Sequence, residues 1–229
     1  MKVINKGRGV HSREVVGIKK LQEELPHDWL AFTNLELALP NGGREIDVIL
    51  ISEDRIIAID LKDWHGKIES SGGDWSQNGK IREGGSPVSK ILENSRQLWI
   101  LLDKFLKQQA VKAGASPSSV DVPKVEGCIV LTATTDRSGI APTEITKVFS
   151  IDQFIKMIKN PKQRVLEMGK VSSVFHTPGI TTPAWKEKWN KFFNAGTGPF
   201  KVSSRQYGGY RADSDEYSFK HAKDIFSEY

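Results

Sequence analysis

Cysteine is almost absent from this sequence: the 229 residues contain one, Cys128. A lone cysteine excludes a disulfide framework and a cysteine-based zinc cage, two common ways of stapling a small domain. It also suits a reducing compartment, so we expect a cytoplasmic protein. A chain of this length can bury a sizeable core without staples, as one domain with an extension or as two small domains.

Long apolar runs are missing as well. No stretch approaches the roughly 20 apolar residues that a membrane-spanning helix needs. The first residues, MKVINKGRGVHSRE, contain no apolar segment of a secretory signal peptide. What is present is ordinary for a soluble globular protein, because 38% hydrophobic and 27% charged residues exclude wholesale disorder.

Positive charge is concentrated at the N-terminus. The whole chain has a formal net charge of +5, which plain solubility explains as well as nucleic-acid binding does. Residues 1–20 account for that excess, because one acid, Glu14, stands against six basic residues: Lys2, Lys6, Arg8, Arg13, Lys19 and Lys20. We expect this segment, and Lys2, Lys6 and Arg8 in particular, to meet phosphates.

Apolar periodicity divides the chain into the elements of an α/β fold. Helices are predicted where apolar residues recur with the 3.6-residue period, and strands where short β-branched runs lie between turns. The expected helices are 12–25, 88–109, 152–158 and 183–194, and the expected strands are 29–37, 45–51, 56–61, 125–132 and 147–149, with hairpins within 67–80. The Gly-, Ser- and Tyr-rich stretch after residue 194 is typical of a linker or an extended arm.

The strongest chemical pattern lies in two adjacent strands, one carrying Asp47 and the other carrying Asp60 and Lys62. If the strands form a hairpin centred on Glu53-Asp54, the residue numbers of facing pairs sum to 107, and Asp47 faces Asp60. Facing partners have Cβ atoms roughly 4.5–5.5 Å apart on one face of the sheet. Lys62 lies two residues beyond Asp60, so its side chain points to the same face.

Two carboxylates in direct opposition destabilise a strand pair unless something compensates their charge. Mg²⁺ does so, because it binds one or two carboxylates and keeps water ligands for substrate phosphates. Lys62 could then orient or deprotonate an attacking water, or stabilise the transition state, and the implied reaction is phosphodiester hydrolysis. The alternative is structural, with Asp47 at an exposed sheet edge and Asp60 paired with Lys62 or Arg44.

A third acid, Glu14, precedes Ile18, Leu21 and Leu25 at helical spacing, so it falls on the face of the first helix that should be buried. A carboxylate on such a face is costly unless it is paired or bound to metal. The simpler alternative is that Glu14 lies near the helix N-terminus and gains from the helix dipole.

Several short motifs follow one another in an order that resembles a known family. They are Ser12-Arg13-Glu14-Val15-Val16, Phe32-Thr33-Asn34-Leu35, Glu45-Ile46-Asp47, Asp60-Leu61-Lys62, Trp64-His65-Gly66 and Gly73-Asp74-Trp75, followed by the long helix after Ser86-Pro87. In this order the chain resembles the nuclease-related domain, NERD, of the PD-(D/E)XK nuclease superfamily. The resemblance covers residues 10–110 well and residues 125–158 more loosely.

The resemblance implies a PD-(D/E)XK restriction-endonuclease-like core, with a mixed central β-sheet flanked by α-helices. It implies a DNA-cleaving enzyme in which Glu14, Asp47 and Asp60 ligate Mg²⁺, which Mn²⁺ would replace, and in which Lys62 is the catalytic lysine. We expect residues 10–160 to form this nuclease core and residues 161–229 to form a C-terminal extension.

The chain departs from the family pattern at two positions. Asp60 stands where the family usually has Glu, which is one methylene longer. Lys90 stands where the family often has Gln near the start of the long helix, and we expect Lys90 to contact a phosphate instead. The acids and the lysine are otherwise intact, which favours an active enzyme.

Members of this family are often fused to helicase, kinase or other domains in bacteria, and some occur in anti-phage systems. The resemblance therefore implies a nuclease module of a larger defence or DNA-processing protein, with DNA and a fused domain or second protein as partners. A homo-oligomer is compatible with it, because many nucleases of this superfamily dimerise. The alternatives are a non-cleaving nucleic-acid-binding or regulatory module joined to a helicase or kinase domain, and a protein-interaction adaptor with structural acids.

Overall fold

The computed structural model describes residues 1–6, 12–37, 44–168, 179–194 and 200–202 of the chain. Its strands are β1 (Lys2–Asn5), β2 (Leu30–Leu37), β3 (Arg44–Ile51), β4 (Ile56–Lys62), β5 (Gly66–Ser71), β6 (Asp74–Gln77), β7 (Lys80–Arg82), β8 (Val125–Leu131), β9 (Thr135–Gly139), β10 (Val148–Ser150) and β11 (Phe200–Val202). Its helices are α1 (Ser12–Glu24), α2 (Pro87–Lys112), the 3₁₀ turn η1 (Pro117–Ser119), α3 (Pro142–Ile145), α4 (Ile151–Lys159), α5 (Pro161–Met168) and α6 (Pro183–Phe192).

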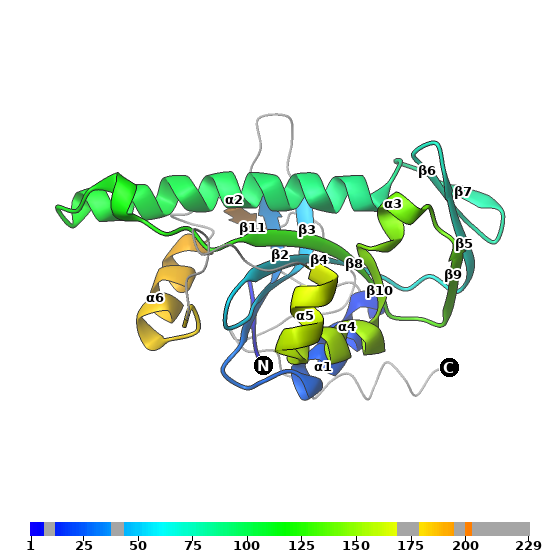
Figure 1. Ribbon diagram of the computed structural model, residues 1–229, viewed down its shortest axis with the longest axis horizontal. Helices are drawn as coiled ribbons and strands as arrows, with labels where there is room; N and C mark the ends of the chain where they lie inside the picture. Colours follow the sequence, from blue (N-terminus) through cyan, green and yellow to red (C-terminus); the bar gives the residue numbers. More distant parts are fainter. Residues whose placement is uncertain (7–11, 38–43, 169–178, 195–199, 203–229) are drawn as a thin grey trace.

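The main sheet is mixed and has helices on both faces. Its strands follow the order β1-β2-β3-β4-β8-β10, and β11 also pairs with β2. The β2–β3–β4 part is antiparallel, whereas β4 pairs with β8, β8 with β10 and β1 with β2 in parallel. The long helix α2 crosses one face of this sheet, and α1, α4 and α5 cover the other face (Figure 1). The expected α/β core with a mixed central sheet is therefore confirmed.

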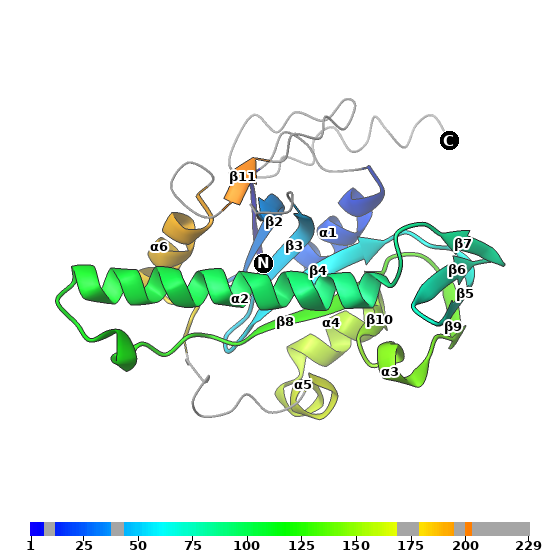
Figure 2. The ribbon, with the colours of Figure 1, turned by 90° about the horizontal axis from the view of Figure 1, so that it is seen from above.

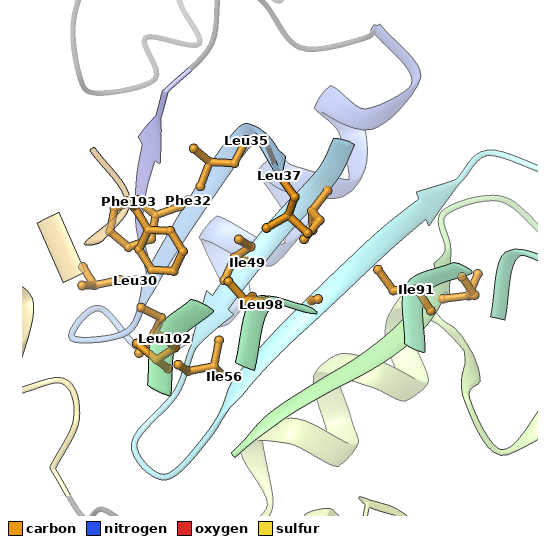
Figure 3. Close-up of a cluster of buried hydrophobic side chains, with 14 of the residues drawn as sticks. Leu30, Phe32, Leu35, Leu37, Ile49, Ile56, Ile91, Leu98, Leu102 and Phe193 are labelled. Carbon is orange, nitrogen blue, oxygen red and sulfur yellow. The ribbon is translucent and has the colours of Figure 1, made fainter. Parts of the chain in front are cut away.

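Alternation along β4 divides its side chains between the two faces. Ile56 and Ala58 belong to the apolar cluster under α2, part of which Figure 3 shows, and Ile57, Ile59 and Leu61 belong to the cluster against α1 and α4. Because β4 is buried on both faces, its sequence is a continuous apolar run until Asp60. The first polar side chains of the strand therefore appear where it leaves the core.

A buried ion network fixes the turn end of the β3–β4 hairpin, opposite Asp60. The Arg55 side chain is completely buried and pairs with Glu126 of β8 at 2.9 Å and with Asp54 at 3.2 Å. Arg164 of α5 pairs with Asp54 at 3.5 Å and with Glu53. Removing one partner from such a network leaves an uncompensated buried charge, which is strongly destabilising. The network therefore secures the position of β4 beside β8.

A second, smaller sheet follows the order β7-β6-β5-β9 and lies beside the N-terminal end of α2 (Figures 1 and 2). It is attached through the fully buried Trp75, whose Nε1 donates a hydrogen bond of 3.1 Å to Glu144 of α3. Glu144 also accepts a hydrogen bond from Ser86, the residue that caps the N-terminus of α2. One carboxylate thus holds the small sheet against the start of the long helix.

The C-terminal helix α6 contributes to the core of the main sheet. Trp189, Phe192 and Phe193 are completely buried, and the Phe193 ring stacks on Phe32 of β2 with centroids 4.4 Å apart. Most of the stretch expected to be a linker lies outside the described residues, although Phe200–Val202 forms β11. Among the helices that the structure describes, none combines the length and the apolarity needed to cross a membrane.

Candidate functional site

The β3–β4 hairpin has the register expected from residue counting. Val48 faces Ile59 and Ile51 faces Ile56, so the residue numbers of each pair sum to 107. Asp47 and Asp60 are the next positions in this register, one step beyond the last backbone pair. There the Asp47 carboxylate replaces a strand partner, because its Oδ2 accepts a hydrogen bond of 2.7 Å from the backbone N–H of Leu61.

The carboxyl groups of Asp47 and Asp60 lie close together and share a hydrogen bond. Burial raises the pKa of Asp47 well above its ordinary value, and the negative charges of Asp60 and Glu14 raise it further. Asp47 therefore keeps its proton to a higher pH than an exposed aspartate does. The two acids thus form a hydrogen-bonded pair, and a bound cation would favour the charged form of Asp47.

Lys62 lies beside this pair, with its Nζ 2.5 Å from Asp60 Oδ1 and its side chain 28% exposed. Burial lowers the pKa of Lys62, but the charges of Asp60 and Asp47 outweigh it and raise the pKa overall. The ammonium group therefore stays charged at neutral pH. The structural alternative is partly realised, because Asp60 does pair with Lys62, but Asp47 is half-buried and hydrogen-bonded rather than at an exposed edge.

Glu14 approaches the acids from the other face of the sheet. It lies half-buried in the first turn of α1, where the helix dipole also favours a carboxylate. One turn further on, Gly17 packs so closely that a Cβ there would stand 2.7 Å from Thr132 Cγ2 and 3.3 Å from Leu61. This contact places the start of α1 against the end of β4. The charge of Glu14 consequently raises the pKa of both Asp47 and Lys62.

Lys2, the first residue of β1, and Lys6, which follows its last residue, lie at opposite ends of the main sheet. Lys2 faces Leu30, which in turn faces Ile51 beside the hairpin turn. Lys6 lies beyond the other end of β1, where its backbone N–H donates a hydrogen bond of 3.1 Å to Thr33 O.

Lys6 lies at the same end of the main sheet as Asp47 and Asp60, on the face that α2 covers. Thr33 faces Val48, the neighbour of Asp47, and Lys6 Nζ is 6.0 Å from the ring centroid of Phe32, a residue of the cluster under α2. Lys6 is therefore at the same end of the sheet as the acids, and Lys2 is not. Arg8 lies outside the described residues.

Lys90 lies exposed on the first turns of α2. Its amine lies over the turn before the helix, where a Cβ on Gly84 would stand 2.5 Å from Lys90 Nζ.

Trp64 also lies beside the candidate site, although no chemical role is predicted for it from the sequence. The Lys62 amine is 6.0 Å from its ring centroid. The signal was present in the sequence, because Trp64 lies two residues beyond Lys62 and continues the alternation of Asp60 and Lys62.

The donor set fits a hard divalent cation. Neighbouring carboxylates suit Mg²⁺, which accepts one or two protein carboxylates and keeps its remaining ligands as water. Across the residues that the structure describes, no three His, Cys, Asp or Glu side chains already form a closed metal-binding group. Asp47 and Asp60 are the residues that would hold the ion, with Glu14 contributing negative charge beside them.

A mixed sheet flanked by helices, with acids and a lysine where two central antiparallel strands leave the core, defines a nuclease-like core. The chain belongs to the nuclease-related domain family of the PD-(D/E)XK-like superfamily, and the family model matches residues 11–132. That range contains Glu14, Asp47, Asp60 and Lys62.

One curated relative extends beyond the family match. The probable kinase PglW of Streptomyces coelicolor is 24% identical over 176 residues, which cover 72% of this chain and 10% of that protein. The chain thus spans about a tenth of the length of this relative. No solved structure matches the chain significantly.

Proposed function

We propose that this chain is a Mg²⁺-dependent nuclease module that hydrolyses phosphodiester bonds in DNA. The observation that carries the proposal is the grouping of Asp47, Asp60 and Lys62 at the end of the β3–β4 hairpin, with Asp47 and Asp60 sharing a hydrogen bond and Lys62 paired with Asp60. Acids that repel one another are retained at a cost in stability, which a bound cation and its phosphate substrate would offset.

Each side chain has a distinct part in this proposal. Asp47 and Asp60 would hold the ion, and Glu14 would add negative charge to the site. Lys62 is charged, so it suits the binding of a phosphate oxygen and the stabilisation of charge that develops in the transition state, more than the removal of a proton from water. When bound, Mg²⁺ would polarise the phosphate and acidify a water molecule; Mn²⁺ is the natural substitute in a test.

The test is cleavage of supercoiled plasmid DNA with Mg²⁺ or Mn²⁺ by the wild type and by Lys62→Ala. We expect the variant to lose at least ~100-fold in rate, the usual contribution of one electrostatic catalytic group. Lys107→Ala is a matched control, because Lys107 pairs with Asp103 in the C-terminal part of α2, and that part of the helix lies away from the end of β4 (Figure 2). Thermal unfolding confirms that each variant is folded. A wild type that binds DNA but never cleaves it with either metal contradicts the proposal.

A second candidate is a nucleic-acid-binding or regulatory module that does not cleave and serves a fused domain. The similarity to a small part of a protein named as a probable kinase favours this alternative. Under either function the chain acts as one module of a larger bacterial protein, of a defence or DNA-processing type. Cleavage by the wild type decides between the two, because a regulatory module binds DNA without turnover.

A further inference from the structure

Trp64 lies between the candidate site and the small sheet. It follows Lys62 by two residues, and the Lys62 amine is 6.0 Å from the centroid of its half-buried ring. The inner side of the ring packs on Trp75 of β6, with centroids 6.0 Å apart and planes inclined by 56°. The two tryptophans differ in their surroundings, because Trp75 is completely buried and hydrogen-bonded to Glu144.

A second cation lies beside the Trp64 ring. Arg82 of β7 has its Cζ 5.7 Å from the ring centroid and is exposed. β7 is a terminal strand of the small sheet, and all three of its residues are exposed, including Ile81 at 70%. Within the described part of the chain, neither Lys80 nor Arg82 forms an ion pair with a carboxylate. The small sheet thus presents an aromatic ring and uncompensated positive charge next to the candidate site.

The position of this ring is fixed by hydrogen bonds around it. Asn78, in the turn between β6 and β7, donates from Nδ2 to His65 O and accepts at Oδ1 from the Lys67 N–H, at 3.3 and 2.8 Å. Gln77 donates a further bond of 2.7 Å to His65 O. The backbone that follows Trp64 is therefore tied to the small sheet. A fixed aromatic ring beside cations is the arrangement that binds single-stranded nucleic acids, by stacking bases and attracting the backbone.

We infer that Trp64, with Arg82, forms a stacking platform for an unpaired base of the DNA strand whose phosphate is bound beside Lys62. This inference rests on the proposed nuclease function and adds the substrate class, which is single-stranded DNA or a locally unpaired strand. The distance supports it, because 6.0 Å is less than twice the ~3.4 Å rise per nucleotide along a strand. A base stacked inside a duplex has both faces covered by its neighbours, so only an unpaired base offers a face to Trp64.

The experiment measures binding in EDTA, where no cleavage occurs, using fluorescein-labelled oligothymidylate and an abasic strand of equal length and charge. We expect the wild type to bind oligothymidylate more tightly than the abasic strand. In Trp64→Ala the affinity for oligothymidylate should fall roughly tenfold, which is the contribution of one stacked base. The affinity of Trp64→Ala for the abasic strand should stay at the wild-type value. Trp64→Phe keeps a stacking ring and should retain most of the preference.

Trp185→Ala is the matched control. Its ring is also half-buried and lies 4.2 Å from a lysine, Lys188, but it belongs to α6, away from the small sheet. We expect no change in either affinity for this variant. Equal losses on both strands in Trp64→Ala would overturn the platform and leave the nuclease proposal standing. Failure of the wild type to bind either strand would also overturn the platform, whereas plasmid cleavage with Mg²⁺ or Mn²⁺ decides the nuclease proposal separately.

Discussion

At the scale of the residue, Asp47 bears the main electrostatic conflict of the fold. Its pKa is raised by burial and by the charges of Asp60 and Glu14. An acid whose pKa is higher in the folded state than in the unfolded state binds its proton more tightly when folded. Its contribution to stability is complete below the unfolded pKa, ~3.9 for aspartate, and is lost as the pH rises through the raised folded value. The metal-free protein should therefore weaken on the alkaline side.

Asp47→Asn tests this conflict. The amide oxygen can still accept the Leu61 N–H, but the negative charge is gone. We expect the metal-free variant to unfold a few degrees above the wild type at pH 8 and to show no such gain near pH 4, where Asp47 is protonated. Mg²⁺ should raise the unfolding temperature of the wild type and not that of the variant. Thermal unfolding between these pH values, with EDTA or Mg²⁺, measures both effects.

Asp152→Asn is the control for this prediction, because Asp152 is 78% exposed and forms a surface ion pair with Lys20. Its unfolding temperature should follow that of the wild type at every pH. An Asp47→Asn protein that is less stable than the wild type at pH 8 would contradict the account of Asp47.

The register that brings the candidate site residues together was predictable from the sequence, because the register of a hairpin follows from counting residues away from its turn. The sum of 107 holds for every backbone pair of β3 and β4. Counting could not show that Asp47 would accept the Leu61 N–H instead of continuing the ladder. Nor could it show which end of the sheet Lys2 and Lys6 would reach, since that depends on β1 pairing with β2.

At the scale of the element, α2 lies directly on β8 through a glycine. A Cβ on Gly127 would stand 2.7 Å from the backbone oxygen of Ile91 and 3.1 Å from Ser95 Oγ. Gly127 also faces Ala58 of β4, so the helix contacts the sheet where its two central strands carry the smallest side chains. This close contact determines the distance between α2 and the sheet strands that carry the candidate site.

Gly127→Ala should therefore destabilise the protein by about 1–3 kcal/mol, as overpacking against backbone does. Gly17→Ala is the matched comparison, because its new methyl would meet the side chains of Thr132 and Leu61, which can shift, and helix propensity favours the change by ~1 kcal/mol. Chemical denaturation of both variants gives the two free energies of unfolding. A Gly127→Ala protein as stable as Gly17→Ala would contradict this account of the packing.

The long and strongly periodic elements were correctly predicted, as were the short strand β10 and the hairpins of the small sheet, but β1 and β9 were not. The 3.6-residue apolar period of α2 continues over many turns, and β3 and β4 are runs of β-branched residues, so these sequences indicate a helix and two strands clearly. The sequence of β1, Lys-Val-Ile-Asn, is too short for a period and was attributed only to the basic segment. β9, Thr-Asp-Arg-Ser-Gly, has no apolar side chain, so nothing in its sequence indicates a strand. It exists because β5 offers it an edge to pair with.

At the scale of the whole molecule, the net charge matters less than its placement. The excess of +5 lies within residues 1–20, but β1 separates two of its six basic residues, Lys2 and Lys6, toward opposite ends of the main sheet. Lys6 is at the end where Asp47, Asp60 and Lys62 lie, whereas Lys2 is at the end of the hairpin turn. Lys2 and Lys6 therefore do not belong to one phosphate-binding patch.

Lys6→Gln and Lys2→Gln form a matched pair that tests this division. Each phosphate contact contributes ~0.7 to the slope of log affinity against log salt for a single strand. We expect Lys6→Gln to flatten the slope by about that amount and Lys2→Gln to leave it unchanged, measured by titrating labelled oligothymidylate at several salt concentrations. Equal slopes for the wild type and Lys6→Gln would remove Lys6 from the nucleic-acid interface.

The parallel pairing of β4 with β8 determines when, during synthesis of the chain, the candidate site can be completed. Asp60 lies beside Ile129, and the Lys62 carbonyl accepts the Thr132 N–H at 3.0 Å. The strand that carries both residues is thus completed by a neighbour that leaves the ribosome some seventy residues later. A nascent chain that already contains all four candidate catalytic residues has only an unfinished sheet to hold them. Synthesis itself therefore delays the assembly of the proposed catalytic site.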